Sequence, residues 1–460
     1  MILLAINWGS TGLKIAQLLL SLSILVVLHE FGHYITAKWF KCRVEKFYLF
    51  FDPWFSLFKK KIGDTVYGIG WLPLGGYVKI SGMVDESMDK EQMNRPPQPW
   101  EFRSKPAWQR LIIMLGGVTV NVLLAFIIYA GILMKWGEEK VPAASLKYGI
   151  SFHDPIFRDL GFKSGDKILA VDGKPVDEYK NVLKKLLLVD HTVTVERAGQ
   201  KQDIQMPVDL IGKLIEKKKS AAGPLLDPRV PVIVMSVPDS AAVYKAGLRP
   251  GDRIISINKD TTDFNDQYDD LMVKYKKGDS VFLNVKRKDS ILALHTVISI
   301  DGKLGFLKPQ PEQYDSLGIY KYTVKKYVFL EAFPAGVRRA GAELKFYIDQ
   351  FKKILSPKTG AFKGVGGFKA MGSVFSGNGW DWQRFWEMTA MFSIILAFMN
   401  LLPIPALDGG HVLFTLIEMI TGKKPNQKVL EYAQVAGMMI LLALMLYANL
   451  NDWFGWGKGK

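Results

Sequence analysis

The sequence predicts a polytopic α-helical membrane protein that also carries two copies of a small α+β module on one side of the membrane. Three observations lead to this fold class. Four stretches are long and apolar enough to cross a bilayer, one motif in the middle of the chain occurs twice, and basic residues gather in the short connections between apolar stretches. The chain is 49% hydrophobic with a mean hydropathy of +0.09, which fits a few membrane spans combined with water-soluble parts.

The four apolar stretches each approach the roughly 20 residues that a spanning helix needs. They are residues 13–39, 111–136, 385–405 and 432–450. The third reaches this length only if its polar end is counted, because Asn400 and two prolines interrupt it. A buried helix of a soluble protein is the alternative for any one stretch, but residues 122–133 carry almost no polar group. We therefore expect four spanning helices.

Basic residues set the expected orientation, because positive residues in short loops near membrane ends stay in the cytoplasm. The residues that flank the first two spans or lie between the last two are Lys38, Lys41, Arg43, Lys46, Lys59, Lys60, Lys61, Arg103, Lys105, Arg110, Lys423, Lys424 and Lys428. Both termini and residues 137–384 are then expected outside. The net charge of +16 also fits contact with anionic membrane lipid, whereas no motif for nucleic-acid binding is present.

The first inside loop contains an apolar segment, residues 67–78, in which aromatic and aliphatic residues flank a proline and a glycine pair. This pattern predicts two short strands around a turn. A hairpin with bare edges is not stable in lipid, so it must pack against protein or offer an edge strand to a partner. We expect a membrane-associated β-hairpin here.

The long outside region contains an internal repeat. Residues 161–173 (GFKSGDKILAVDG) recur as residues 247–258 (GLRPGDRIISIN). A turn that leads into a strand, present twice, indicates two copies of one β-rich module. The pattern G-x-x-x-G-D-x-I-x-x-(I/V) resembles bacterial PDZ domains, which bind extended peptides at a sheet edge. The pattern identifies no ligand.

The complete expected division of the chain follows from these features. It is 1–40 (first span), 41–109 (inside loop with the hairpin), 110–136 (second span), 137–222 (first PDZ domain), 223–305 (second PDZ domain), 306–384 (amphipathic and linking region), 385–411 (third span), 412–431 (inside loop) and 432–460 (fourth span and tail). Within 306–384, residues 333–355 have an amphipathic pattern that suits either the outer membrane surface or a domain-packing helix.

The first span carries the chemistry, in His29-Glu30-Phe31-Gly32-His33. Two histidines four residues apart lie one helical turn apart, so both can face one metal ion. The glutamate after the first histidine is where a zinc protease keeps its general base. An ionisable His-Glu pair inside a membrane helix is costly unless it is paired or bound to metal.

A third ligand is expected at the end of the third span, in the segment N-L-L-P-I-P-A-L-D-G-G-H of residues 400–411. Its two prolines break the helix, and Gly409 and Gly410 allow a tight backbone. Asp408 is therefore presented from irregular backbone, which a membrane tolerates where it lines a cavity. Two imidazoles, one carboxylate and a water molecule make a catalytic zinc site with an open position.

Together these motifs resemble the site-2 proteases, which are intramembrane zinc metalloproteases, and in particular the bacterial type with tandem PDZ domains. The resemblance covers nearly the whole chain. It rests on the HEFGH helix, the G-x-x-x-N element of residues 117–121, the paired PDZ repeats and the N-x-x-P-x-P-x-L-D-G-G-H segment. It implies one Zn²⁺ ion held by His29, His33 and Asp408, with Glu30 activating the bound water.

The resemblance also implies residues that bind substrate. Asn400 would hydrogen-bond to the substrate backbone, with a helix-packing amide as its alternative. Asn121 matches the family's asparagine in the second span, although Val118 stands where the family often has proline. The hairpin resembles the family's membrane-associated β-loop, whose edge could pair with an unwound substrate. Its expected substrate-binding residues are Gly70, Trp71, Gly75 and Gly76.

The function that the resemblance implies is regulated intramembrane proteolysis of single-span membrane proteins. Substrates would be anti-sigma factors already trimmed outside, or remnants of signal peptides, and the PDZ pair would act as a filter. The protein would lie in the plasma (inner) membrane, with periplasmic PDZ domains and the active site near the cytoplasmic face. The alternative is a membrane-anchored PDZ adaptor or chaperone with a vestigial metal site. The sequence leaves the oligomeric state open.

Overall fold

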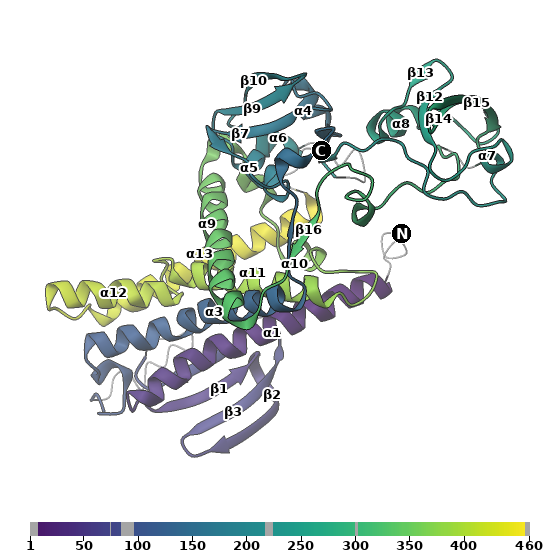
Figure 1. Ribbon diagram of the computed structural model, residues 1–460. Helices are drawn as coiled ribbons and strands as arrows, with labels where there is room; N and C mark the ends of the chain where they lie inside the picture. The colour runs from purple at the N-terminus through teal and green to yellow at the C-terminus, as the bar shows by residue number, and fades with distance from the viewer. Residues whose placement is uncertain (1–7, 74, 84–95, 217–223, 300–301, 456–460) are drawn as a thin grey trace. The chain divides into compact units, whose positions relative to one another are not determined.

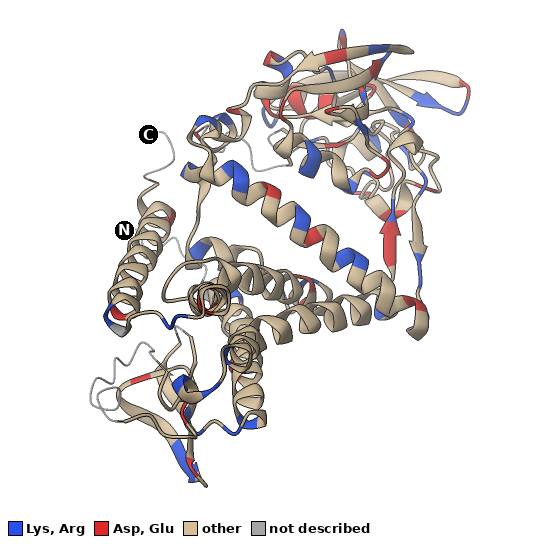
Figure 2. Cartoon of the chain, turned by 90° about the vertical axis from the view of Figure 1, so that its left-hand side faces the viewer, with Lys and Arg blue, Asp and Glu red and all other residues tan. Residues whose placement is uncertain are grey.

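The computed structural model describes residues 8–73, 75–83, 96–216, 224–299 and 302–455 (Figure 1). The chain divides into two compact units. The helical unit contains residues 1–137, 326–352 and 363–460, and the repeat unit contains residues 138–325 and 353–362. Figure 2 shows that charged residues are sparse on the long helices of the helical unit, apart from α9.

Long helices build the helical unit. They are α1 (Trp8–Trp39), α3 (Ala107–Lys135), α9 (Phe329–Leu355), α11 (Trp382–Leu401), α12 (Asp408–Thr421) and α13 (Gln427–Phe454), with the short α10 (Phe368–Ser373) between α9 and α11. Among the described residues, α1, α3 and α13 are long and apolar enough to cross a membrane. The predicted third span corresponds to α11, which does not meet the same criteria, so three of the four predicted spans are supported.

Helix α3 lies at the centre of the helical unit, where it packs against α1, α11 and α12. Gly32 on α1 and Gly116 on α3 bring two backbones into contact. A Cβ atom at Gly116 would lie 2.5 Å from the carbonyl oxygen of Gly32. Helix α9 packs on the same helix, with Gly336 against the backbone of Ala130. This contact favours the packing interpretation of the amphipathic segment within the helical unit.

A four-stranded sheet follows α1. Its strands are β1 (Val44–Leu49), β2 (Phe51–Ile62), β3 (Thr65–Leu72) and β4 (Tyr77–Ile80), in the order β2-β3-β1-β4. Strand β1 runs parallel to β3 and antiparallel to β4. The predicted two-stranded hairpin is therefore wrong, because β1 lies between the two strands that were expected to pair. Residue 74, inside the predicted hairpin, lies outside the described residues.

The sequence pattern did not indicate strand β1, because residues 44–49 mix basic and aromatic side chains and resemble the positively charged flank of a membrane span. In the sheet their side chains alternate between its two faces, and Val44 and Tyr48 are buried. The outer strands are β2 and β4. Strand β2 is largely exposed, with Trp54 91% exposed, whereas β4 packs beside α1.

The repeat unit contains two sheets with the same strand order. The first is formed by β8 (Lys174–Pro175), β7 (Lys167–Val171), β9 (Thr192–Arg197) and β10 (Gln200–Gln205), and the second by β13 (Asp260–Thr261), β12 (Arg253–Ile257), β14 (Ser280–Arg287) and β15 (Ser290–Val297). Their helices are α4 (Pro155–Asp159), α5 (Lys180–Leu188) and α6 (Leu210–Glu216) in the first repeat, and α7 (Ala242–Lys245) and α8 (Asn265–Met272) in the second. The shared order confirms the internal repeat.

A buried ion pair marks the same position in both repeats. Asp166 accepts two hydrogen bonds of 2.7 Å from Arg197, and Asp252 accepts bonds of 2.7 and 2.8 Å from Arg287. Each aspartate side chain is only 1% exposed. A bidentate arginine contact satisfies a buried carboxylate, which explains why the Gly-Asp step occurs in both copies.

Short strands complete the repeat unit. Strand β6 (Ile150–Phe152) pairs with β11 (Leu226–Pro228), and β5 (Glu138–Lys140) pairs with β16 (Thr323–Lys325). Because β11 belongs with β6, the core of the first repeat includes residues beyond 222. The predicted boundary itself, between residues 222 and 223, lies outside the described residues.

Candidate metal centre

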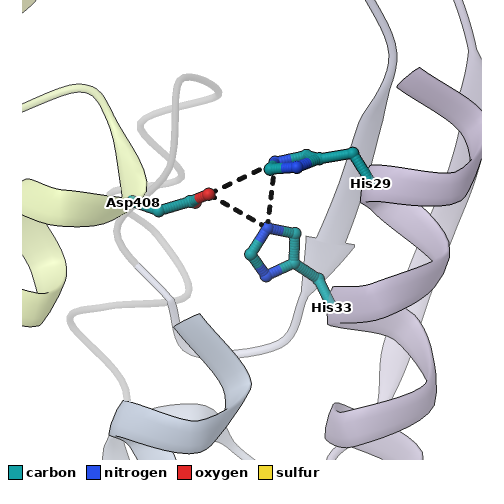
Figure 3. Close-up of side chains that lie close together, drawn as sticks. All are labelled: His29, His33 and Asp408. Atoms are coloured by element: carbon teal, nitrogen blue, oxygen red, sulfur yellow. Dashed lines mark hydrogen bonds and ion pairs between the residues drawn. The ribbon is translucent and has the colours of Figure 1, made fainter. Parts of the chain in front are cut away.

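Three side chains from two helices converge within the helical unit (Figure 3). His29 and His33 lie one turn apart on α1, and Asp408 is the first residue of α12. The Oδ2 atom of Asp408 lies 3.2 Å from Nε2 of His29 and 3.2 Å from Nε2 of His33, and the two Nε2 atoms are 3.3 Å apart. The three atoms form a nearly equilateral triangle. The structure thus brings together the three ligands expected from the sequence.

The triangle fits a zinc site. Ligands at about 2.0–2.2 Å from a tetrahedral zinc ion are separated by roughly 3.3–3.5 Å, close to the distances found here. In addition, Oδ2 of Asp408 is buried without a hydrogen-bond partner of good geometry, although both histidines lie near it. A buried carboxylate oxygen without a donor is costly, and a cation at this position would satisfy it.

The outer nitrogen of each imidazole has a partner that sets the ring's orientation. Nδ1 of His33 lies 2.9 Å from the carbonyl oxygen of Ile113. An Nδ1–H donated to that carbonyl leaves the Nε2 lone pair directed at the triangle. Nδ1 of His29 lies 3.0 Å from Nδ2 of Asn121, whose Oδ1 is buried without a partner. Turning the amide over would offer Oδ1 to His29 as an acceptor.

Asn121 is therefore placed behind the histidine. Its side chain is fully buried, and Oγ of Ser393 on α11 donates a hydrogen bond of 2.7 Å to its backbone carbonyl oxygen. In this position the amide can orient His29, but it does not line the cavity described below. The placement does not support the expected contact between Asn121 and substrate.

A cavity of about 680 Å³ opens beside the triangle. Its lining includes His29, Glu30, His33, Asp52, Gly76, Tyr77, Val78, Asp408, His411 and Gln434. The walls come from α1, α3, α12 and α13 and from all four strands of the sheet that follows α1. Glu30 shares the cavity with the two histidines, and the backbone N–H of Val78 lies beside its carboxylate. Glu30 and the three expected ligands therefore line one cavity.

The expected substrate-binding residues differ in their distance from the site. Asn400, near the end of α11, places Nδ2 3.2 Å from Nε2 of His29. Gly76 lines the cavity, and a Cβ atom there would lie 3.5 Å from Cγ of Glu30. Gly75, with φ of +144°, faces the ring of Phe51 instead.

Gly70 and Trp71 lie on the inner strand β3 and are not among the residues that line the cavity. Trp71 stacks against Trp54 and Phe55 with ring centroids 6.0 and 5.8 Å apart. All four strands of the sheet contribute residues to the cavity lining, and Leu72, the residue after Trp71, is the contribution of β3. The expected contact of Gly70 and Trp71 with substrate stays a prediction.

Some contacts to the site were not anticipated. A Cβ atom on Gly117 would lie 2.6 Å from Cε1 of His29 and would also contact Nε2 of His33. Arg110 at the start of α3 pairs with Glu418 on α12 at 2.5 Å, both side chains being about 10% exposed. Gly117 is the glycine of the G-x-x-x-N element, so the sequence motif could have indicated its place at the site. Arg110 was counted only as a loop charge, and its partner is 308 residues away.

Comparison with known proteins gives a consistent result. The model of the family described as "Peptidase family M50" matches residues 17–444. The chain is 28% identical to the regulator of sigma-E protease RseP of Escherichia coli over 467 residues, covering 95% of this chain and 98% of the relative. It is 24% identical to the regulator of sigma E protease of Haemophilus influenzae, with coverage of 95% and 98%.

A Neisseria meningitidis protein named provisionally as a zinc metalloprotease is 28% identical, with coverage of 93% of this chain and 96% of the relative. Among solved structures, the PDZ domain of an SdrC-like protein from Listeria monocytogenes is 24% identical. It covers 19% of this chain and 92% of its own, with a TM-score of 0.16. At that TM-score the likeness does not establish the fold of either repeat.

Proposed function

The chain belongs to peptidase family M50, and from this membership we propose that it is an intramembrane endopeptidase that cuts the spanning segment of single-span membrane proteins. As a member of that family it is a metalloprotease of the site-2 type, with zinc as its metal. The observation that carries the proposal is the triangle of His29, His33 and Asp408. Two of its corners lie on α1, a helix apolar and long enough to cross a bilayer.

The proposed roles follow from the geometry. His29 and His33 would hold zinc through Nε2, and Asp408 would hold it through Oδ2. Bound zinc lowers the pKa of its water to about 7 and polarises the scissile carbonyl. Glu30 takes a proton from the water as the water oxygen bonds to the carbonyl carbon. It then passes that proton to the leaving amine as the C–N bond breaks.

We propose that substrate enters as an extended strand. A helical span hides its peptide bonds, so the segment must unwind before Glu30 can act on it. Strand β4 is an outer strand of its sheet, and Tyr77 and Val78 line the cavity next to Glu30. An outer strand can pair with an added strand through backbone hydrogen bonds. Asn400, whose Nδ2 lies close to His29, would hydrogen-bond to the substrate backbone.

The proposed biological role rests on the relatives. Two of them are named as regulators of sigma E, which supports anti-sigma factors as a substrate class, with remnant signal peptides as a second. The repeats would act as PDZ filters outside an inner membrane, and the active site would lie near the cytoplasmic face. The position of Lys38, five residues after His33, supports that orientation. No structural observation favours the adaptor alternative.

The proposal is tested with Glu30→Gln. Wild type and variant are purified, their zinc is counted, and cleavage of a single-span substrate is measured in proteoliposomes. Both should hold one zinc ion, and the variant should cleave at least about 100-fold more slowly, because a general base contributes about 10²–10⁴-fold. Glu331→Gln, on an exposed position of α9, is the matched control and should cleave normally. Equal cleavage by wild type and Glu30→Gln would support the adaptor.

A further inference from the structure

The loop between α11 and α12 contains a residue in an unfavourable backbone conformation. Ala406, two residues before Asp408, has φ of +82°. Residues with a Cβ atom rarely adopt this region, because the side chain crowds the following carbonyl. Such a conformation persists only when surrounding contacts impose it. The direction in which the chain enters α12, and with it the position of the Asp408 carboxylate, depends on those contacts.

The contacts come from the fourth long apolar stretch, helix α13. The backbone N–H of Ala406 donates a hydrogen bond of 3.1 Å to Oε1 of Gln434. Gln434 is only 7% exposed and also lines the cavity beside the metal centre. Its amide is therefore a buried polar group with a specific backbone partner, which is a stronger constraint than an exposed contact.

The residue before Ala406 is held just as tightly. A Cβ atom on Gly437, one turn after Gln434 on α13, would collide with the carbonyl group of Pro405. On the other side, a Cβ atom on Gly410 of α12 would lie 2.7 Å from Cα of Pro405. The loop thus passes between two glycines. Gln434 supplies a hydrogen bond from α13 to this loop.

We infer that Gln434 is a positioning residue of the metal centre, which holds Ala406 in its left-handed conformation and so keeps the Asp408 carboxylate at the triangle. This inference rests on the proposed function, because it takes Asp408 to be a zinc ligand. It assigns α13 a part in the metal centre.

The test is zinc affinity, measured by chelator competition on the full-length protein in detergent. Gln434→Met keeps the length of the side chain but removes the amide acceptor. Its affinity for zinc should fall about 10–100-fold, the range for loss of an outer partner of a metal ligand. When Co²⁺ replaces zinc in Gln434→Met, its ligand-field spectrum should differ from that of the Co²⁺-substituted wild type. The matched control is Val435→Met on the same helix, 40% exposed, which should bind zinc as wild type does.

A second substitution separates positioning from general packing. Glycine adopts positive φ without penalty, so Ala406→Gly added to Gln434→Met should restore affinity to within about threefold of wild type. Gln434→Glu, which retains an acceptor oxygen, should also keep its affinity. The inference is contradicted if Gln434→Met binds zinc as tightly as wild type, or if Ala406→Gly fails to restore the loss.

Two further outcomes are distinguishable. If wild type itself binds no zinc, the proposed function fails rather than the role of Gln434 alone. If Gln434→Met does not fold, Gln434→Asn replaces it, because its shorter side chain cannot reach the N–H of Ala406. The same expectation and the same rescue by Ala406→Gly apply to that variant.

Discussion

The metal centre depends on the absence of a Cβ atom at Gly117. The imidazoles of His29 and His33 lie directly against its Cα atom, so α3 forms the back wall of the site. Ile113 and Asn121, one turn before and one turn after Gly117, supply the partners of the two outer nitrogens. One face of α3 therefore sets both the space and the orientation of the histidines.

Gly117→Ala should weaken zinc binding at least about 10-fold, because the added methyl group would displace both imidazoles from the triangle. Gly131→Ala on the same helix is the control, since nothing lies within 4 Å of a Cβ atom there. Equilibrium dialysis against zinc buffers measures both variants. If Gly117→Ala bound zinc as tightly as the control, the close contact between Gly117 and the histidines would not be needed for zinc binding.

The individual ligands were predictable from the sequence, whereas most of their partners were not. His29, Glu30 and His33 follow from helical spacing, and Asp408 follows from the broken helix that presents it. The role of the Ile113 backbone carbonyl could not be predicted from the sequence, because every residue has a backbone carbonyl. Gln434 lies in an apolar stretch and contacts a loop 28 residues away, so only the folded chain reveals its role.

Strand β4 links the sheet to the catalytic residues. It borders α1, lines the cavity with Tyr77 and Val78, and has β1 on its other side. Apolar length alone was enough to predict α1, α3 and α13. The sheet was only partly predictable, because residues close in sequence were assumed to pair and β1 was not recognised. Strand order depends on contacts that a local pattern does not contain.

Pairing of substrate with β4 predicts a particular response to N-methylation. A series of single-span peptides, each N-methylated at one position around the scissile bond, is cleaved by the reconstituted enzyme. Alternate positions should lose cleavage, because successive N–H groups of a strand point to opposite sides. N-methylation well outside this segment serves as the control. A uniform response, or none, would contradict pairing as a strand.

The two units divide the proposed tasks between them, with hydrolysis in the helical unit and selection in the repeat unit. The antiparallel pair β5–β16 joins the ends of the repeats, with Lys140 opposite Thr323. This pairing means that the chain between those positions can be removed and closed with a short linker. Residues 141–322 therefore form a natural segment for deletion.

Deletion of residues 141–322 should leave zinc binding unchanged and should allow cleavage of a substrate that still carries its bulky outer domain. The reason is that the metal centre and its cavity lie wholly in the helical unit. Cleavage of trimmed and untrimmed substrate is compared in proteoliposomes, with trimmed substrate as the internal control. If the deleted protein still required trimming, the repeats would not be the filter.

Mapping the cleaved bond tests whether zinc chemistry takes place within a membrane span. A single-span substrate is incubated with wild-type protein in proteoliposomes, and the products are identified by mass spectrometry. The account predicts one or a few cuts inside the apolar segment of the substrate, absent in Glu30→Gln and in zinc-free protein and restored by adding zinc. Cuts confined to the water-exposed flanks, or cuts that persist in Glu30→Gln, would contradict it.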